Sequence, residues 1–407
     1  MDLRQRLDGA LVLAPMTRGG NLPFRRLCAE LGARVLMSEM TVARRLKQRR
    51  RGEFALIRKA PDEPFFGVQL AGTDPDEMAW AAALVESRGA DLVDVNVGCP
   101  IDHFTRKGMG AALGRQPKRI RRIVEAMKRA LTAAPVTAKI RLGWNDGDRN
   151  YMDQAAAAAD GGADAVIVHG RTRDARYRQS ADWDAIGEVA AALTVPVVGN
   201  GDILFPHHIV EARARSGCTG VMAGRGVLIK PWLFKEASDG YWDIGAEERL
   251  AIYRRYVELA REHWGEDDHG LTRVREFTAW HLGFWCRYAP RRADGTWPGM
   301  QTREPAAFAR SPLEALLARG DDAAIAWLAD RLVAQEDVDP AAAPGPSAAP
   351  GEPADVMRRR KADVRRRTRP RKWCLAPLAD TGNGARHYAW RGTPASMIIR
   401  RGAQHTS

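Results

Sequence analysis

The chain has 407 residues, which is enough for two folded units and a further segment. Its composition, with 45% hydrophobic and 28% charged residues, is that of a globular protein in water, and no run of about 18 apolar residues predicts a membrane span. The net charge of +13 is uneven, because residues 358–372 carry +9 and residues 373–407 a further +3, so the basic total does not by itself indicate a nucleic-acid partner.

Apolar, β-branched runs alternate with helical patterns eight times between Leu11 and Glu236, which predicts βα units and a parallel sheet. No GxGxxG turn follows the first strand, so we predict an α/β fold of the (β/α)8 TIM-barrel type and not a doubly wound sheet. The expected strands span 11–14, 35–39, 65–70, 92–97, 136–140, 164–169, 196–199 and 220–223. The expected helices span 22–31, 40–49, 75–88, 117–131, 150–161, 183–192, 206–215 and 230–237.

The segment after residue 246 has no strand pattern, and its apolar positions recur at helical spacing. We predict a four-helix domain there, with helices over 249–264, 271–288, 305–319 and 321–333. Trp280, Phe284 and Tyr288 share one helix face in this prediction, and we interpret them as core packing and not as a platform for stacking bases.

The composition of residues 337–407 indicates a linker followed by a basic tail. Residues 337–357 hold five prolines among Ala, Gly and Ser, which is typical of a linker, and the basic tail that follows is expected to be disordered. The predicted organisation is a barrel domain over 1–240, a helical domain over 246–335, a linker over 337–357 and a tail over 358–407.

The cysteines lie more than fifty residues apart, so no CxxC pair or zinc-ligand spacing exists and we expect no metal. We expect reduced, buried thiols at four of them, Cys28, Cys218, Cys286 and Cys374, and treat Cys99 separately. The charged N-terminus lacks a small-residue cleavage site, so we expect no secretory signal and a cytoplasmic location.

Polar or glycine residues stand at the carboxyl end of every predicted strand, which is where barrel enzymes carry their catalytic groups. Burying Gln69, Lys139 and His169 over one cavity without a ligand would leave unpaired polar groups, so we expect a bound polar cofactor. The glycines after the last two strands lie where barrels bind phosphate, with Arg225 as the available charge, although ordinary tight turns are the alternative.

Together these residues resemble the tRNA-dihydrouridine synthase family, from Leu11 to about Val333. The similarity is greatest to its eukaryotic variable-loop branch, the tRNA-dihydrouridine(47) synthase-like proteins, which usually have zinc fingers before the barrel. We expect the RNA contacts of those fingers to be absent here or replaced by other residues. The segments that resemble the family are 14–17, 95–100, 107–113, 139–141, 169–171 and 199–202. Those that resemble the branch are 98–102, 181–183, 228–234 and 263–265.

The resemblance implies an FMN cofactor with NADPH or NADH as a transient reductant. A lysine at a strand end, such as Lys139, would also stabilise the negative charge of a reduced flavin. The implied cofactor-binding residues are Pro15, Met16, Thr17, Gln69, Lys139, His169, Asn200, Gly201, Asp202, Gly224 and Arg225.

The implied reaction reduces a uridine of tRNA to 5,6-dihydrouridine, with hydride going from the flavin to C6 and a proton to C5. Cys99 is the expected proton donor, because a thiol with a pKa of about 8.5 is mostly protonated at neutral pH. A buried structural cysteine is the alternative. We expect Asn96, Lys107, Arg141 and Arg171 to contact the substrate.

Three basic segments, 44–51, 118–122 and 171–178, are candidates for contacts with RNA phosphates, with solvated helix faces as the alternative. Residues 358–372 are either an RNA tether or a solubilising extension. Two other functions stay open: an FMN-dependent dehydrogenase of a free pyrimidine or dihydroorotate, and a non-catalytic RNA-binding protein. We expect a monomer with tRNA as its partner and no membrane contact.

Overall fold

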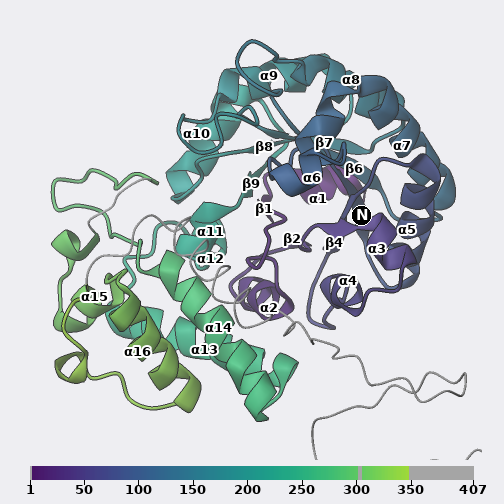
Figure 1. Cartoon of the computed structure of the whole chain (residues 1–407). Coiled ribbons are helices and arrows are strands. Elements are labelled where there is room, and N and C mark those ends of the chain that lie inside the picture. Colours follow the sequence, from purple (N-terminus) through teal and green to yellow (C-terminus); the bar gives the residue numbers. More distant parts are fainter. Residues whose placement is uncertain (1, 301–304, 348–407) are drawn as a thin grey trace, which may run out of the picture. The chain divides into compact units, whose positions relative to one another are not determined.

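The computed structural model describes residues 2–300 and 305–347, and within them eight parallel strands form a closed barrel. Hydrogen bonds between β2 and β4 close the sheet, and the short β3 (Thr41–Val42) pairs with the end of β4. Helices surround this ring of strands (Figure 1), which confirms the predicted TIM barrel. The barrel strands are β1 (Leu11–Leu13), β2 (Val35–Met37), β4 (Phe66–Ala71), β5 (Leu92–Asn96), β6 (Val136–Arg141), β7 (Ala165–His169), β8 (Val197–Asn200) and β9 (Gly220–Ala223).

Most barrel helices lie where the apolar periodicity predicts them. They are α2 (Leu22–Glu30), α5 (Pro75–Ser87), α7 (Pro117–Ala130), α8 (Tyr151–Asp160), α9 (Trp183–Ala192) and α10 (Pro206–Ser216). Short elements not predicted are α1 (Leu3–Leu7), α4 (Arg51–Leu56), α6 (Asp102–Thr105), the 3-10 helix η1 (Gly110–Arg115) and α11 (Arg225–Ile229).

Two predicted helices were wrong in extent. The segment predicted as helix 40–49 begins with β3 and continues as α3 (Ala43–Lys47), because Thr41 and Val42 pair with the end of β4. The segment predicted as 230–237 starts later, as α12 (Leu233–Asp239). Pro231 cannot donate a backbone hydrogen bond, so the chain breaks between α11 and α12.

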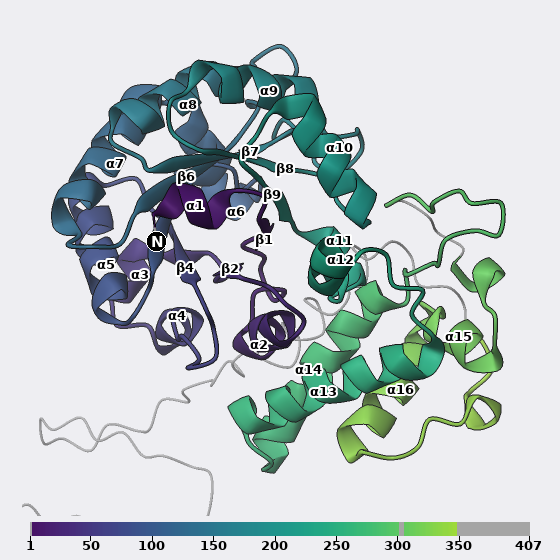
Figure 2. The same ribbon diagram turned by 180° about the vertical axis from the view of Figure 1, so that it is seen from behind.

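The barrel interior is apolar at the end where the strands begin. Helix α1 closes that end, with Leu3 and Leu7 buried, and Figure 2 shows it lying across the opening. Apolar side chains from most strands meet it there, so the polar side chains of the barrel interior lie toward the carboxyl ends of the strands. The buried members of this layer are Leu3, Leu7, Val12, Ala14, Val35, Met37, Phe65, Leu92, Ala165, Ile167, Val198 and Met222.

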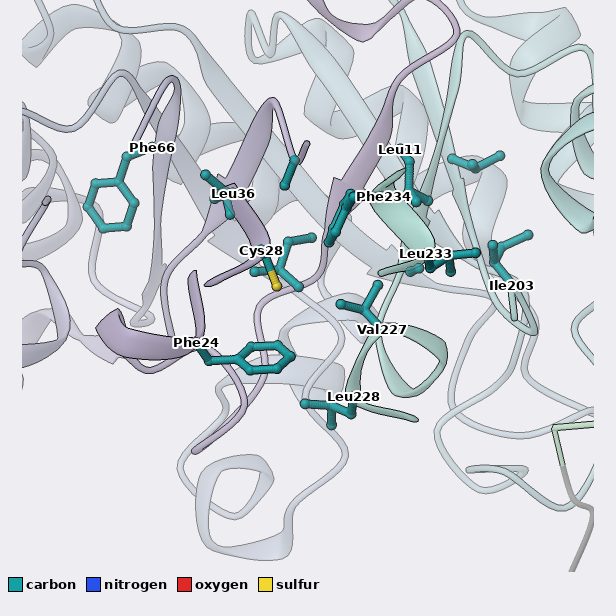
Figure 3. Packing of buried hydrophobic residues seen from close by; sticks show 14 of the residues in the cluster. Leu11, Phe24, Cys28, Leu36, Phe66, Ile203, Val227, Leu228, Leu233 and Phe234 are labelled. Atoms are coloured by element: carbon teal, nitrogen blue, oxygen red, sulfur yellow. The ribbon is translucent and has the colours of Figure 1, made fainter. Parts of the chain in front are cut away.

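The outer face of the sheet packs against its helices in a larger core. Figure 3 shows Phe24 and Cys28 of α2 near Leu228 and Phe234, which come from the segments after β9. These side chains are all buried. Packing of this kind joins the first and last βα units and holds β1 between β2 and β9.

The helical region after the barrel differs from its prediction in one helix. The segment predicted as 305–319 is a 3-10 turn followed by a short helix, since Ser311 caps a new helix that starts at Pro312. Tyr288 is buried but lies beyond the end of α14 at Trp285, whereas the predicted helix extended to residue 288. Trp280 and Phe284 are partly buried and pack against the core, as predicted. The elements are α13 (Ala246–Trp264), α14 (Asp268–Trp285), η2 (Pro305–Phe308), α15 (Pro312–Leu317), α16 (Asp322–Ala334) and η3 (Pro340–Ala342).

Helix α2 joins the barrel to this region, and both parts belong to one compact unit. Two ion pairs cross from α2 to α13, Arg26 to Glu262 at 2.6 Å and Arg255 to Glu30 at 2.8 Å. The ring of His281 stacks on Phe24 of α2. The division into a barrel domain that ends at residue 240 and a helical domain that begins at residue 246 stays a prediction. The predicted tail lies outside the described residues, and no described helix is long and apolar enough to cross a bilayer.

A buried ion pair fixes the connection between β2 and β4. Arg25 on α2 donates from Nε to Glu63 at 2.6 Å, and both side chains are almost fully buried. Arg25 also donates to the carbonyl oxygens of Gly20 and Arg58. The neighbouring Arg26 forms only partly exposed ion pairs.

We therefore expect Arg25→Met to lower the free energy of unfolding by about 3–5 kcal/mol, because it leaves a buried carboxylate unpaired. Arg26→Met, the control on the same helix, should change it by less than about 1 kcal/mol, as is usual for exposed pairs. Urea denaturation of both variants measures the difference. Equal midpoints would show that the buried pair does not stabilise the fold.

Candidate active site

Polar side chains fill the barrel interior at the carboxyl ends of its central strands. Gln69 of β4 and Asn96 of β5 are buried there, as are His169 of β7 and Asn200 of β8, and Lys139 of β6 is half-buried. Cross-strand register places these residues side by side, with Asn96 opposite Lys139 and His169 opposite Asn200. The structure therefore brings together the polar strand ends that the sequence predicts would share one cavity.

Hydrogen bonds orient the amides of this layer. Asn96 Nδ2 donates to Gln69 Oε1 at 2.6 Å, and Lys139 Nζ donates to Asn200 Oδ1 at 2.9 Å. Asn200 Nδ2 in turn donates to the carbonyl oxygen of Met222 at 2.7 Å. Because a backbone carbonyl only accepts, this last bond fixes which way the Asn200 amide points and leaves its oxygen for Lys139.

The loop that carries Cys99 is held from three sides. The backbone N–H of Cys99 donates to Asn96 Oδ1 at 2.9 Å, and its carbonyl oxygen accepts from Ala111 at 3.0 Å. Arg141 Nε donates to the carbonyl oxygen of Gly98 at 2.7 Å. Gly110 has a φ of +61°, and a Cβ there would lie 2.5 Å from the Cys99 carbonyl oxygen. The η1 turn therefore packs against Cys99 as closely as a glycine allows.

The Cys99 thiol is protonated at neutral pH. Burial raises the pKa of Cys99, and the backbone N–H of Ile101 and the charge of Arg141 oppose that rise only in part. Arg141 is itself buried beside the loop, so its charge is available to a thiolate formed there. The arrangement suits a thiol that donates its proton.

Positive charge gathers around a neutral histidine. Burial lowers the pKa of His169 well below its usual value, and the charges of Arg141, Lys139, Arg171 and Arg225 lower it further. Lys139 responds in the same way, because burial and Arg141 lower its pKa. An anionic ligand would relieve this repulsion, so the pocket has the electrostatics of an anion-binding site.

A second group of charges lies after β7, β8 and β9. Arg171 is buried and donates to both carboxylate oxygens of Asp202, and Arg225 lies 3.5 Å from the same carboxylate. Gly201 has a φ of +143°, and a Cβ there would lie 2.4 Å from the Cβ of Ala181. Asp202 thus orients two arginines beside a turn that requires glycine.

Other predicted residues lie farther out. Pro15 and Met16 are half-buried and Thr17 is exposed, and a Cβ on Gly224 would lie 3.4 Å from Sδ of Met16. Lys107 is exposed on the loop after β5, where its Nζ lies 3.4 Å from His103 Nε2. Lys107 therefore does not belong to the buried polar layer.

The sequence prediction missed two residues of this layer or its rim, Asp94 and Tyr177. Asp94 is fully buried and accepts hydrogen bonds from Gln69 at 2.7 Å and from Thr137 at 2.6 Å. Asp94 precedes Asn96 by two positions and so faces the same side of β5, a signal that the alternation of strands provides. Tyr177 lies on the loop after β7 with its ring 3.8 Å from the Arg225 guanidinium, and no sequence signal indicates this contact.

Comparison with known proteins identifies the family. The family model described as dihydrouridine synthase (Dus) matches residues 12–282, about two thirds of the chain. A tRNA-dihydrouridine(47) synthase [NAD(P)(+)] of Coprinopsis cinerea is 39% identical over 336 residues, which cover 78% of this chain and 50% of the relative. A tRNA-dihydrouridine(47) synthase [NAD(P)(+)]-like protein of Homo sapiens is 41% identical over 321 residues, which cover 77% of this chain and 49% of the relative.

The chain spans about half the length of the curated relatives it matches. The match to the family nevertheless includes every barrel strand except the first residue of β1, together with the polar layer, the Cys99 loop and helices α13 and most of α14. The chain belongs to the dihydrouridine synthase family.

Proposed function

We propose that this chain reduces a uridine of tRNA to 5,6-dihydrouridine, using FMN as its cofactor and NAD(P)H as its reductant. The observation that carries the proposal is the geometry at the carboxyl ends of the strands, where the Cys99 loop is bonded to Asn96 and Arg141 beside the buried polar layer. The names of the relatives support the substrate and the reductant. They also specify position 47, which is the first uridine to test.

The residues present fit FMN. The pocket combines an excess of buried cations with amides of fixed orientation, which suits a ligand that has an anionic phosphate and a polar ring edge. Gln69 and Lys139 would hold the ring edge, while Gly201, Gly224 and Arg225 would hold the phosphate. Pro15, Met16 and Thr17 would line the ring. Reduced FMN, when bound, supplies a hydride to C6 of the uracil.

Cys99 completes the reduction. Its Sγ holds a proton at neutral pH and delivers it to C5 of the uracil, which leaves a thiolate on the protein. Arg141, whose guanidinium binds the Gly98 carbonyl of the same loop, stabilises that thiolate by its charge. Asn96 positions the loop through its bonds to the backbone N–H groups of Gly98 and Cys99.

RNA must reach this pocket with one base turned out of its stack, so phosphate contacts are needed on the surface around it. Exposed arginines of α4 and the preceding turn, and of α7, are suited to that role. Within the basic segment 171–178, Arg171 is buried and paired with Asp202. We therefore assign the phosphate contacts of this segment to Arg176 and Arg178, which are exposed.

The purified chain should be yellow from bound flavin, a result that a non-catalytic RNA-binding protein would not give.

Lys139→Met should weaken FMN binding about 10- to 100-fold, because a hydrogen bond from a charged group contributes about 1.5–3 kcal/mol. Lys128→Met, on the outer face of α7, is the control and should bind FMN as the natural chain does. Flavin absorbance and fluorescence titration measure both, and a colourless natural chain would contradict the proposal.

Cys99→Ala should keep FMN and tRNA binding but lower turnover by about 100-fold or more, the usual contribution of a general acid. Cys218→Ala, which removes a buried thiol remote from the loop, should leave turnover unchanged. Dihydrouridine at position 47 of unmodified tRNA is the readout. Reduction of free uracil or orotate with none of tRNA would identify a small-molecule dehydrogenase instead.

The raised pKa of Cys99 predicts how its alkylation depends on pH. Since only the thiolate reacts, the alkylation rate of the Cys99 peptide should rise with a midpoint above about 8.5, the ordinary value for cysteine. Arg141→Met should move the midpoint higher still, because it removes a charge that favours the thiolate. A midpoint below neutral pH would mean that Cys99 is a thiolate and not a proton donor.

A further inference from the structure

Asp94 is a buried carboxyl group at the centre of the polar layer, and the reaction proposed above does not use it. The side chain is fully inaccessible to solvent and lies two residues before Asn96 on β5. Its Oδ2 accepts from Gln69 Nε2 at 2.7 Å, and its Oδ1 accepts from Thr137 Oγ1 at 2.6 Å. A carboxyl group at such a position requires hydrogen-bond partners, and Asp94 has them on both oxygens.

These bonds continue in one direction to the Cys99 loop. Gln69 receives a hydrogen bond from Asn96 Nδ2 at 2.6 Å, and Asn96 Oδ1 accepts from the N–H groups of Cys99 at 2.9 Å and Gly98 at 3.3 Å. Each end of this series of hydrogen bonds has a fixed role: the backbone N–H of Cys99 only donates, and the Asp94 oxygen accepts from Gln69. Each amide between them therefore has a single favourable orientation.

We propose that Asp94 is a positioning residue, which fixes the Cys99 loop through the amides of Gln69 and Asn96. Without an acceptor at position 94, the Gln69 amide is free to turn its Nε2 toward Asn96, where it meets another donor. Asn96 then relieves the conflict only by turning its own Nδ2 toward the N–H of Cys99, which releases the loop. The inference rests on the proposed function only for its effect on turnover.

A role as a counter-charge for Lys139 is the competing explanation. Among the described residues, Lys139 Nζ donates to Asn200 and forms no hydrogen bond with Asp94, although the charge of Asp94 raises the pKa of Lys139. Two substitutions separate these roles. Asp94→Asn removes the charge but keeps an oxygen for Gln69 and can donate to Thr137 Oγ1, whereas Asp94→Leu removes both the charge and the acceptor.

The experiment measures the alkylation rate of the Cys99 peptide by mass spectrometry in the full chain, with dihydrouridine formation as the second readout. We expect Asp94→Leu to change the Cys99 alkylation rate and to lower turnover, each by about tenfold, the effect of one lost buried hydrogen bond. Asp94→Asn should keep the Cys99 alkylation rate and the turnover within about twofold of the values for the natural chain, since its side chain still has an oxygen that accepts from Gln69. Thr137→Val, which leaves the Gln69 bond in place, should keep the Cys99 alkylation rate within about twofold as well.

Unchanged Cys99 alkylation in a folded Asp94→Leu variant would overturn the proposal, and so would an Asp94→Asn variant that behaves like Asp94→Leu. If Asp94→Leu does not fold, Asp94→Ser replaces it, because serine stays polar but is too short to reach Gln69. If the natural chain forms no dihydrouridine, the proposed function fails, while the alkylation rates still test the role of Asp94.

Discussion

Hydrogen bonds between β2 and β4 close the sheet, and closure forces every second side chain of each strand into one small interior. That interior has room for apolar packing at one end and for a ligand at the other. Helix α1 and the apolar layer fill the first end, so the polar side chains all gather at the second. The position of the site follows from this division more than from any single loop.

Polar groups buried in this way must satisfy one another, and the result is a pocket of defined polarity. The amides of Gln69, Asn96 and Asn200 each have both of their functional atoms engaged, so none is free to turn. Burial lowers the pKa of His169, and the surrounding cations lower it further, which keeps the ring neutral. A site with fixed dipoles and surplus positive charge is prepared for an anionic cofactor before the cofactor binds.

The proposed proton donor is controlled by the same surroundings. Burial favours the protonated Cys99 thiol, while the charge of Arg141 would favour the thiolate left by the proposed proton transfer. The barrel thus sets the protonation state of the thiol, and hydrogen bonds to Asn96 and Arg141 fix the backbone of its loop. Helix α2 connects the barrel to the helical region through the ion pair of Arg26 with Glu262 and the stacking of Phe24 on His281.

The sequence by itself predicted the barrel, because eight apolar runs with helical spacers indicate parallel strands and no GxGxxG turn of a doubly wound sheet follows the first of them. It also determined the polar strand ends, since strand direction decides which end carries function. It did not predict β3 or the break between α11 and α12, which depend on pairing with β4 and on local proline geometry. Strand alternation already placed Asp94 on the same face as Asn96, but only the tertiary structure decided that Asp94 bonds to Gln69, that Arg171 pairs with Asp202 and that Tyr177 contacts Arg225. The reason is physical: such contacts join residues that lie on different strands or loops and meet only when the barrel closes, and no local pattern in the chain records them.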